Sequence, residues 1–347
     1  EKLVVDLAGE VSRTALQHKN LNGELAALVR GDFNDVEKTI VQPSDIEVRV
    51  GFNEQSDVLA ANDRAGDSGN ATAVAYANTP LNLPWERYLS VYFRDVLDEI
   101  FQQDGRLPPV LASHLGLKEL RGLGSDGKIS VSAQYDRAVL VGLTDITAAV
   151  QHRDWLPVQE VRRNVTLIFQ ACLDLFQEAY GQQFKRPRIA VNTLGNFVRG
   201  GWFVDSGNRE AKPYRDAFSS YGVTEDSFGG EDQSKPSCPL TLLARNSACW
   251  VVQEGYADFA KVTASVRIGR EDVRISVYTN GTLKKGLTQQ ELETLLRKKV
   301  RPLNIPEAVS RFALGTPETY ELIRQTSDYF QNPKYNWNGK PEPVRIS

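Results

Sequence analysis

The sequence is poor in the residues that build disulfide frameworks and metal centres. Its 347 residues include only three cysteines and three histidines. Cys172, Cys238 and Cys249 are too few and too scattered for a disulfide framework or a zinc ribbon, so we expect buried thiols and a reducing compartment. No two histidines lie four residues apart, which argues against a histidine-rich metal site. We expect each histidine to be a surface or core residue.

Methionine is absent altogether, even at position 1. An ordinary composition would supply roughly eight methionines in a chain of this length. We therefore expect that residues are missing from the sequence or that its start is truncated. Spacings between motifs would then be short by one or more positions.

Long apolar runs and an excess of positive charge are also lacking. No apolar stretch approaches the roughly 20 residues of a membrane-spanning helix, and no secretory or transit signal opens the sequence. The formal net charge of −3 argues against nucleic acid as a bulk partner. What is present, 41% hydrophobic and 24% charged residues, is typical of a water-soluble globular protein. We expect a cytoplasmic protein that binds neither a membrane nor nucleic acid.

The spacing of apolar residues predicts helices and strands in mixed order. The predicted helices cover 1–16, a segment that begins at Pro84, 161–176, 240–253 and a segment behind the capping-box pair Thr288 and Glu291. The predicted strands cover 45–52, 128–135, 138–146, 188–192, 261–269 and 273–279. Because strands and helices do not alternate strictly, we expect an α+β fold and not a doubly wound parallel sheet. The helix-plus-hairpin blocks near 84–146 and 240–298 resemble degenerate repeats of one α+β unit.

The segment 195–239 has no regular pattern and is rich in Gly, Ser, Asp and aromatic residues. It is too long for a bare connector, so it is either a functional loop system or disordered. Its stretch 229–235 (GGEDQSK) is not a Walker A loop, because a second Gly before the Lys is missing. No dinucleotide-binding fingerprint follows a predicted strand either.

Six short segments stand out because of their order along the chain. They are Ala65–Gly69 (AGDSG), Ser125–Tyr135 (SDGKISVSAQY), Gln151 with His152, Val191–Asp205 (VNTLGNFVRGGWFVD), Ser227–Lys235 (SFGGEDQSK) and Tyr335–Trp337 (YNW). In sequence and order they resemble the motifs of the S-adenosylmethionine synthetase family, nearly from end to end. Each motif alone occurs by chance in many proteins, whereas six in one order indicate a divergent member.

The resemblance implies a fold and an assembly. The fold is α+β, with three similar α/β-mixed domains around a pseudo-threefold axis. The expected domains are an N-terminal domain of residues 1–80 with parts of the C-terminal region, a central domain of 81–185 and a C-terminal domain of 186–347, interleaved with one another. The family is usually dimeric, so we expect a homodimer, or a dimer of dimers, with active sites at the subunit interface.

The resemblance also implies a reaction between ATP and L-methionine. As a methionine adenosyltransferase, the chain would let the methionine sulfur attack C5′ of ATP and expel triphosphate, which is then hydrolysed to phosphate and pyrophosphate. A thioether carries no proton, so the attack needs positioning and positive charge over the leaving group, and no general base. Mg²⁺ held by carboxylates would supply part of that charge, with K⁺ as a further candidate cation.

Eight residues match family positions with a role. Those that match catalytic or phosphate-binding lysines are Lys128, Lys212 and Lys235, those that match substrate-binding residues are Gln55, Asp67 and Phe197, and those that match metal carboxylates are Asp126 and Asp205. In this set Phe197 corresponds to the aromatic ring that stacks on adenine. Asp126 and Lys128 lie two apart at the start of a predicted strand, so we expect both to project to one side.

The chain also departs from the family pattern. It has Ala211 in place of an Arg and Glu231 in place of a Lys, so the triphosphate pocket would be about three charge units less positive. It also has Ser237 in place of an Asp. Losing one preorganised donor costs about 2.7 to 4 kcal/mol, and two losses about 5 to 8 kcal/mol. The arginines that could compensate from the same irregular region are Arg199, Arg209 and Arg215.

These departures leave three hypotheses open. The first is an active synthetase with redistributed cationic side chains. The second is a catalytically impaired paralogue that acts as a nucleotide-binding or regulatory subunit. The third is an enzyme for another nucleotide or thioether, suggested by Trp202 and Phe203 where the family has a Pro and a small residue.

Overall fold

The computed structural model describes residues 3–11, 21–31, 41–54, 68–181, 185–200, 218, 220–222, 235–268, 270, 272–300, 304–314, 316–326 and 330. The strands are β1 Leu3–Val11, β2 Ile46–Glu54, β3 Gly69–Tyr76, β4 Leu123–Asp136, β5 Val139–His152, β6 Arg188–Val191, β7 Phe259–Val266 and β8 Arg274–Tyr278. The helices are α1 Leu21–Gly31, α4 Trp85–Gln102, α5 Pro109–Leu115, α6 Val158–Tyr180, α8 Ser237–Gln253, α9 Gln289–Lys299, α10 Ile305–Arg311 and α11 Pro317–Thr326, with short 3₁₀ turns η2 Pro43–Asp45 and η3 Pro80–Asn82.

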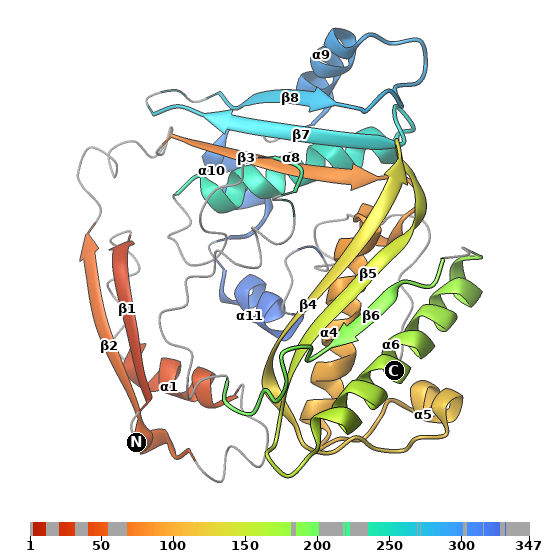
Figure 1. Ribbon diagram of the computed structural model, residues 1–347. Coiled ribbons are helices and arrows are strands. Elements are labelled where there is room, and N and C mark those ends of the chain that lie inside the picture. Colours follow the sequence, from red (N-terminus) through yellow and green to blue (C-terminus); the bar gives the residue numbers. More distant parts are fainter. Residues whose placement is uncertain are drawn as a thin grey trace.

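The strands form three sheets, in the orders β1-β2, β3-β7-β8 and β4-β5-β6 (Figure 1). The predicted mixture of helices and strands is confirmed. The pseudo-threefold arrangement of three similar domains stays a prediction, as do the domain boundaries near residues 80 and 185. Among the described helices, none is long and apolar enough to cross a membrane.

The prediction of a helix over residues 1–16 was wrong. Residues 3–11 form β1, which runs parallel to β2 with Leu3 opposite Ile46. Leu3 and Val5 are half-buried while Val4 is exposed, so apolar burial alternates with a period of two. The four-residue spacing of leucine and valine also fits a strand with every second residue inward. Pairing with β2, which is distant in the sequence, therefore stabilises residues 3–11 as a strand.

The predicted strand over 45–52 is confirmed by β2. Ile46 is buried beside Val29 of α1, and Val48 packs against this small cluster, which is separate from the main core. The alternation of Ile46, Val48 and Val50 in the sequence predicts that all three side chains face inward. Val50 is 41% exposed, so that detail of the prediction was wrong.

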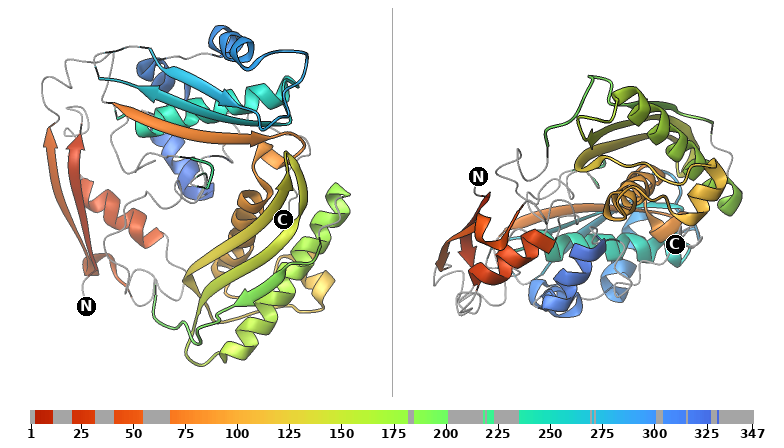
Figure 2. Two further views of the ribbon diagram at one scale, coloured as in Figure 1. Left: turned by 45° about the horizontal axis from the view of Figure 1, so that its top comes forward. Right: turned by 90° about the horizontal axis from the view of Figure 1, so that it is seen from below.

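The long hairpin of β4 and β5 carries the sheet that matters most for the site. The predicted strands 128–135 and 138–146 are confirmed, and both extend further. β6 adds parallel to β5, with Ile146 opposite Ile189. Helices α4 and α6 pack on one another, with the rings of Phe93 and Phe169 4.5 Å apart, beside this sheet (Figure 2). The helix predicted behind Pro84 is α4, and its broad apolar face is buried throughout.

The second three-stranded sheet was only partly predicted. β7 and β8 confirm the strands expected at 261–269 and 273–279, whereas β3 was missed. β3 is Ala-rich, and seven of its eight residues are buried, so no inward–outward alternation marks it in the sequence. It pairs antiparallel with β7, and α8 packs against both strands. Each helix-plus-hairpin block is thus present, with a third strand that is antiparallel in this sheet and parallel in the other.

A buried arginine fixes α8 to the turn that follows β3. Arg245 is fully buried and donates hydrogen bonds to the carbonyl oxygens of Val74, Leu81 and Asn82. Leu81 and Asn82 both have positive φ, 54° and 55°. Carbonyls in such a turn point away from regular partners, and a fixed planar fork of donors satisfies several of them at once.

We expect Arg245→Leu to lower the free energy of unfolding by about 3 kcal/mol or more, because three buried carbonyls lose a charge-assisted donor. Urea denaturation of the variant and the parent protein measures this loss. Arg163→Leu, whose guanidinium is exposed on α6, is the control and should change stability by less than about 0.5 kcal/mol. A loss below about 1 kcal/mol for Arg245→Leu would show that the turn does not depend on this side chain.

Candidate functional site

Two neighbouring residues at the end of β5 join the start of β4 to the loop that follows β6. The Asp126 amide donates to Gln151 Oε1 (3.0 Å), and Gln151 Nε2 donates to the carbonyl oxygen of Val198 (3.2 Å). The His152 amide donates to the Phe197 carbonyl oxygen (2.9 Å), and the Phe197 amide donates back to His152 Nε2 (3.2 Å). We call these five residues, Asp126, Gln151, His152, Phe197 and Val198, the clasp.

The hydrogen bonds of His152 assign its tautomer. Its Nδ1 lies 2.9 Å from the carbonyl oxygen of Arg153, which can only accept, so Nδ1 carries the hydrogen. Nε2 is then unprotonated and can accept from the Phe197 amide. His152 is 1% exposed, so the neutral ring is enclosed by these partners. A doubly protonated ring would place one N–H against another and would break the contact with Phe197.

Gly200 lets the Asp126 carboxylate and the Phe197 ring approach one another. A Cβ atom placed on Gly200 would lie 2.6 Å from Asp126 Oδ2 and 2.9 Å from Phe197 Cε2, which is closer than real side chains come. Both groups therefore lie against the same backbone position. The structure brings together one residue expected to bind a metal and the ring expected to stack on adenine.

Asn192 turns the chain from β6 toward this place. Its side chain accepts from the Val150 amide (2.7 Å) and donates to the Val150 carbonyl (2.9 Å), so it continues the sheet where the β6 backbone departs. Its φ of 45° is left-handed, a conformation that asparagine tolerates better than most residues. Sequence reasoning gave no role to Asn192 or Gly200. Both lie inside the segment 191–205, and for Asn192 the available signal was the tolerance of asparagine for a left-handed backbone.

His152 has a role that the sequence did not reveal. It was expected to be a surface or core residue, and it is buried as a core residue while also positioning Phe197. The apolar–polar pattern of β5 gave no reason to connect it with a residue 45 positions later. The only feature of the sequence that pointed to a role for His152 was its position next to Gln151 in one of the six ordered segments.

The other predicted site residues fall into two groups. Lys128 is exposed on β4 opposite Ala149, and Lys235 is half-buried just before α8. That Asp126 and Lys128 project to one side stays a prediction. The predicted site residues and departures that lie outside the described residues are Gln55, Asp67, Asp205, Ala211, Lys212 and Glu231.

The described residues supply only part of the ligand set of a magnesium ion. Within the described ranges, no group of three or more His, Cys, Asp or Glu side chains could hold a metal ion. Mg²⁺ at nucleotide sites uses one or two carboxylates together with substrate phosphates and water. The half-buried Asp126 carboxylate fits that role, with phosphate oxygens as the remaining ligands.

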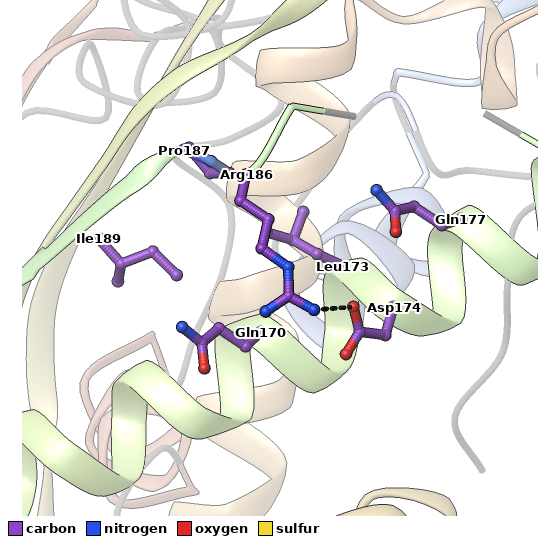
Figure 3. A pocket seen from close by; sticks show the side chains of 7 residues that line it. All are labelled: Gln170, Leu173, Asp174, Gln177, Arg186, Pro187 and Ile189. Carbon is purple, nitrogen blue, oxygen red and sulfur yellow. Dashed lines mark ion pairs between the residues drawn. The ribbon is translucent and has the colours of Figure 1, made fainter. Parts of the chain in front are cut away.

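A cavity between α6 and β6 is not connected with the predicted site. It has a volume of about 20 Å³, and an ion pair between Arg186 and Asp174 (3.5 Å) crosses it (Figure 3). A space of this size holds about one water molecule. The residues that line it are Gln170, Leu173, Asp174, Gln177, Arg186, Pro187 and Ile189, and none was predicted as a site residue.

A cluster of tyrosines anchors part of the irregular segment to α4. The hydroxyls of Tyr135 and Tyr221 each donate to the Glu86 carboxylate (2.6 Å), and Tyr135 accepts from the Trp85 amide (2.8 Å). The Tyr76 hydroxyl lies 3.3 Å from that of Tyr221. Burial raises the pKa of Tyr135 and Tyr221 above the ordinary tyrosine range, with the Glu86 charge as a further cause, and raises the pKa of Tyr76 to about 12.

Comparisons with known proteins point to one family. No protein-family model matches the sequence. The S-adenosylmethionine synthase of Aquifex aeolicus is 28% identical over 292 residues, which cover 82% of this chain and 70% of that protein. The S-adenosylmethionine synthase of Prochlorococcus marinus strain MIT 9515 is 28% identical over 314 residues, or 86% and 72% of the two chains.

A solved structure shares the fold. It is described as an unusual S-adenosylmethionine synthetase from Campylobacter jejuni, and it superposes with a TM-score of 0.72 at 20% identity. The match covers 97% of this chain and 86% of that one. At this identity the likeness concerns the fold and not the chemistry.

The clasp predicts slow hydrogen exchange at the Phe197 amide. We expect His152→Leu to remove the acceptor of that amide and to speed its exchange by about two- to tenfold, since one hydrogen bond contributes about 0.5–1.5 kcal/mol and 1.4 kcal/mol corresponds to tenfold. NMR exchange measurements test this, with Gln134→Leu on the exposed face of β4 as control. Unchanged protection of Phe197 in His152→Leu would refute the assigned bond.

The tyrosine cluster predicts a loss of stability at alkaline pH. The unfolded tyrosines ionise near pH 10 while the buried ones keep their protons, so the free energy of unfolding should fall as pH rises above 10. Each such tyrosine contributes up to about 1.4 kcal/mol per pH unit to this slope. Urea denaturation between pH 9 and 11 should show a shallower slope for Tyr221→Phe than for the parent. Tyr278→Phe, at a 52% exposed position, should leave the slope unchanged, and equal slopes in all three proteins would contradict the prediction.

Proposed function

Because the chain is a divergent relative of the S-adenosylmethionine synthases, we propose that it is a methionine adenosyltransferase. It would join the sulfur of L-methionine to C5′ of ATP and release triphosphate, then phosphate and pyrophosphate. The observation that carries the proposal is the clasp, which sets the Asp126 carboxylate and the Phe197 ring against Gly200. In a bound nucleotide the carboxylate would hold Mg²⁺ at the phosphates and the ring would stack on the base.

The reaction requires the protein to position the two substrates and to stabilise the negative charge of the leaving triphosphate. The S–C5′ bond forms as the C5′–O bond breaks, and the electron pair leaves with the triphosphate oxygen. No proton moves at sulfur, so no base is assigned. Phe197 would stack on adenine and hold C5′ in line, while Lys128, Lys212 and Lys235 would stabilise the charge on the leaving group. Mg²⁺, held by Asp126 and Asp205, would neutralise part of that charge, and K⁺ is a further candidate.

We further propose a homodimer, or a dimer of dimers, in the cytoplasm. Lys128 lies on an exposed face of β4 that also carries Ser130 and Ser132, so a second chain on this face would enclose the phosphate end. The three free cysteines are all buried, as predicted, which suits a reducing compartment.

A regulatory or nucleotide-binding paralogue is the second candidate. Ser237 is 5% exposed at the first position of α8, where the family pattern has an Asp. A serine hydroxyl is neutral and binds Mg²⁺ weakly, so this position adds nothing to the metal site. Together with Ala211 and Glu231, it favours a site that binds ATP without turning it over.

Product analysis separates the two candidates. Purified protein with ATP, methionine and Mg²⁺ at millimolar concentrations should form S-adenosylmethionine, detected by mass spectrometry, with phosphate and pyrophosphate in equal amounts. Lys128→Met and Asp126→Asn should each lower kcat by about 100-fold or more, because each removes a preorganised charge from the leaving-group site. Lys298→Met on the exposed side of α9 is the control. Tight ATP binding in calorimetry without product would establish the regulatory candidate instead, and neither binding nor product would overturn both.

A further inference from the structure

A second pocket lies at the turn between β7 and β8, away from the clasp. It has a volume of about 140 Å³ and is lined by Ser265, Arg267, Arg270, Asp272 and Arg274. The lining thus contains three arginines and one aspartate. Within the described part of the chain, no hydrogen bond or ion pair engages the side chains of these three arginines, and all three residues are exposed.

The strand pairing gathers this charge on one side of the hairpin. Ser265 lies opposite Arg274, and burial alternates so that Val266, Val273 and Ile275 face the core. The Arg270 amide donates to the Arg267 carbonyl oxygen (2.9 Å), which closes the turn. Like charges held close on neighbouring strands repel and cost stability. Among the described residues of the turn no ion pair offsets this cost, which is expected where the charges serve a ligand.

The pocket adjoins the segment that the proposed function assigns to substrate. The Ile268 amide donates to Ser68 Oγ (2.9 Å), and Val266 pairs with Gly69 at the start of β3. Ser68 directly follows Asp67, which lies outside the described residues. The arginines are therefore held beside the chain position of a residue that matches a substrate contact.

We propose that Arg267, Arg270 and Arg274 form a binding site for a phosphate-class oxyanion. Guanidinium groups bind phosphoryl oxygens through paired, charge-assisted hydrogen bonds, and three of them around Asp272 suit a ligand with more than one negative charge. The volume is below the roughly 300–1,000 Å³ of sites that enclose a whole organic ligand. The site thus takes a phosphoryl group, either of a free polyphosphate or of a bound nucleotide.

The site would add cationic side chains that the family pattern does not place there. That role rests on the proposed function, in which Ala211 and Glu231 leave the triphosphate pocket less positive than in the family. The binding itself needs only the geometry of the hairpin. Binding and catalysis are therefore tested separately.

Calorimetry with sodium tripolyphosphate tests the site on the full chain. We expect the Arg267→Gln, Arg270→Gln, Arg274→Gln triple variant to bind tripolyphosphate at least tenfold more weakly than the parent, and Asp272→Asn to bind it more tightly. A tighter variant cannot result from misfolding. Arg163→Gln, which removes one exposed positive charge from α6, is the control and should bind like the parent.

The same titration with ATP, and with Lys128→Met as a reference, distinguishes the sources. If tripolyphosphate binding depends on the three arginines and persists in Lys128→Met, the site is assigned to a free polyphosphate. If the triple variant loses affinity for ATP alone, the site is assigned to the phosphates of a bound nucleotide. Both support the inference, even if the protein forms no S-adenosylmethionine. Equal affinity of parent and triple variant for both ligands, or no binding of either by the parent at millimolar concentration, would overturn it.

Discussion

The reciprocal hydrogen bonds between His152 and Phe197 are the constraint on which the candidate site depends. They join the end of β5 to a loop that has left the sheet, and they require a neutral ring with its hydrogen on Nδ1. Gln151 extends the contact to Asp126 on one side and to Val198 on the other. A carboxylate and an aromatic ring from separate segments are thereby held in place before any ligand arrives, which is the preorganisation that catalysis by positioning needs.

Polar side chains also connect segments that are distant in the sequence elsewhere in the fold. The buried Arg245 holds the turn behind β3 by donating to several of its carbonyl oxygens, and the half-buried Glu86 carboxylate accepts from the hydroxyls of both Tyr135 and Tyr221. The tip of the β4–β5 hairpin meets the other sheet at the rings of Tyr76 and Tyr135, whose centroids lie 4.8 Å apart (Figure 1). The two three-stranded sheets are therefore coupled through polar and aromatic contacts as well as through the shared apolar core.

The sequence allowed most of the regular elements to be predicted, because local periodicity determines them. α4 and α6 bury one continuous face each, and the capping box before α9 is present as Thr288 and Glu291. β1 was mistaken for a helix because its spacing fitted both periods and its partner β2 lies about 40 residues away. β3 was missed because small residues buried on both faces leave no alternation. For the site, the resemblance supplied Asp126 and Phe197, whereas Asn192, Gly200 and the role of His152 depend on contacts between distant segments that no local pattern records.

A crystal structure of the protein with Mg²⁺, methionine and a non-hydrolysable triphosphate analogue of ATP would test the proposed site most directly. We expect the adenine to lie against the Phe197 ring and the phosphates to face Asp126 and Lys128, with the His152–Phe197 bonds intact. A nucleotide bound elsewhere, with the Phe197 ring and the Asp126 carboxylate both free of ligand, would contradict the assignment.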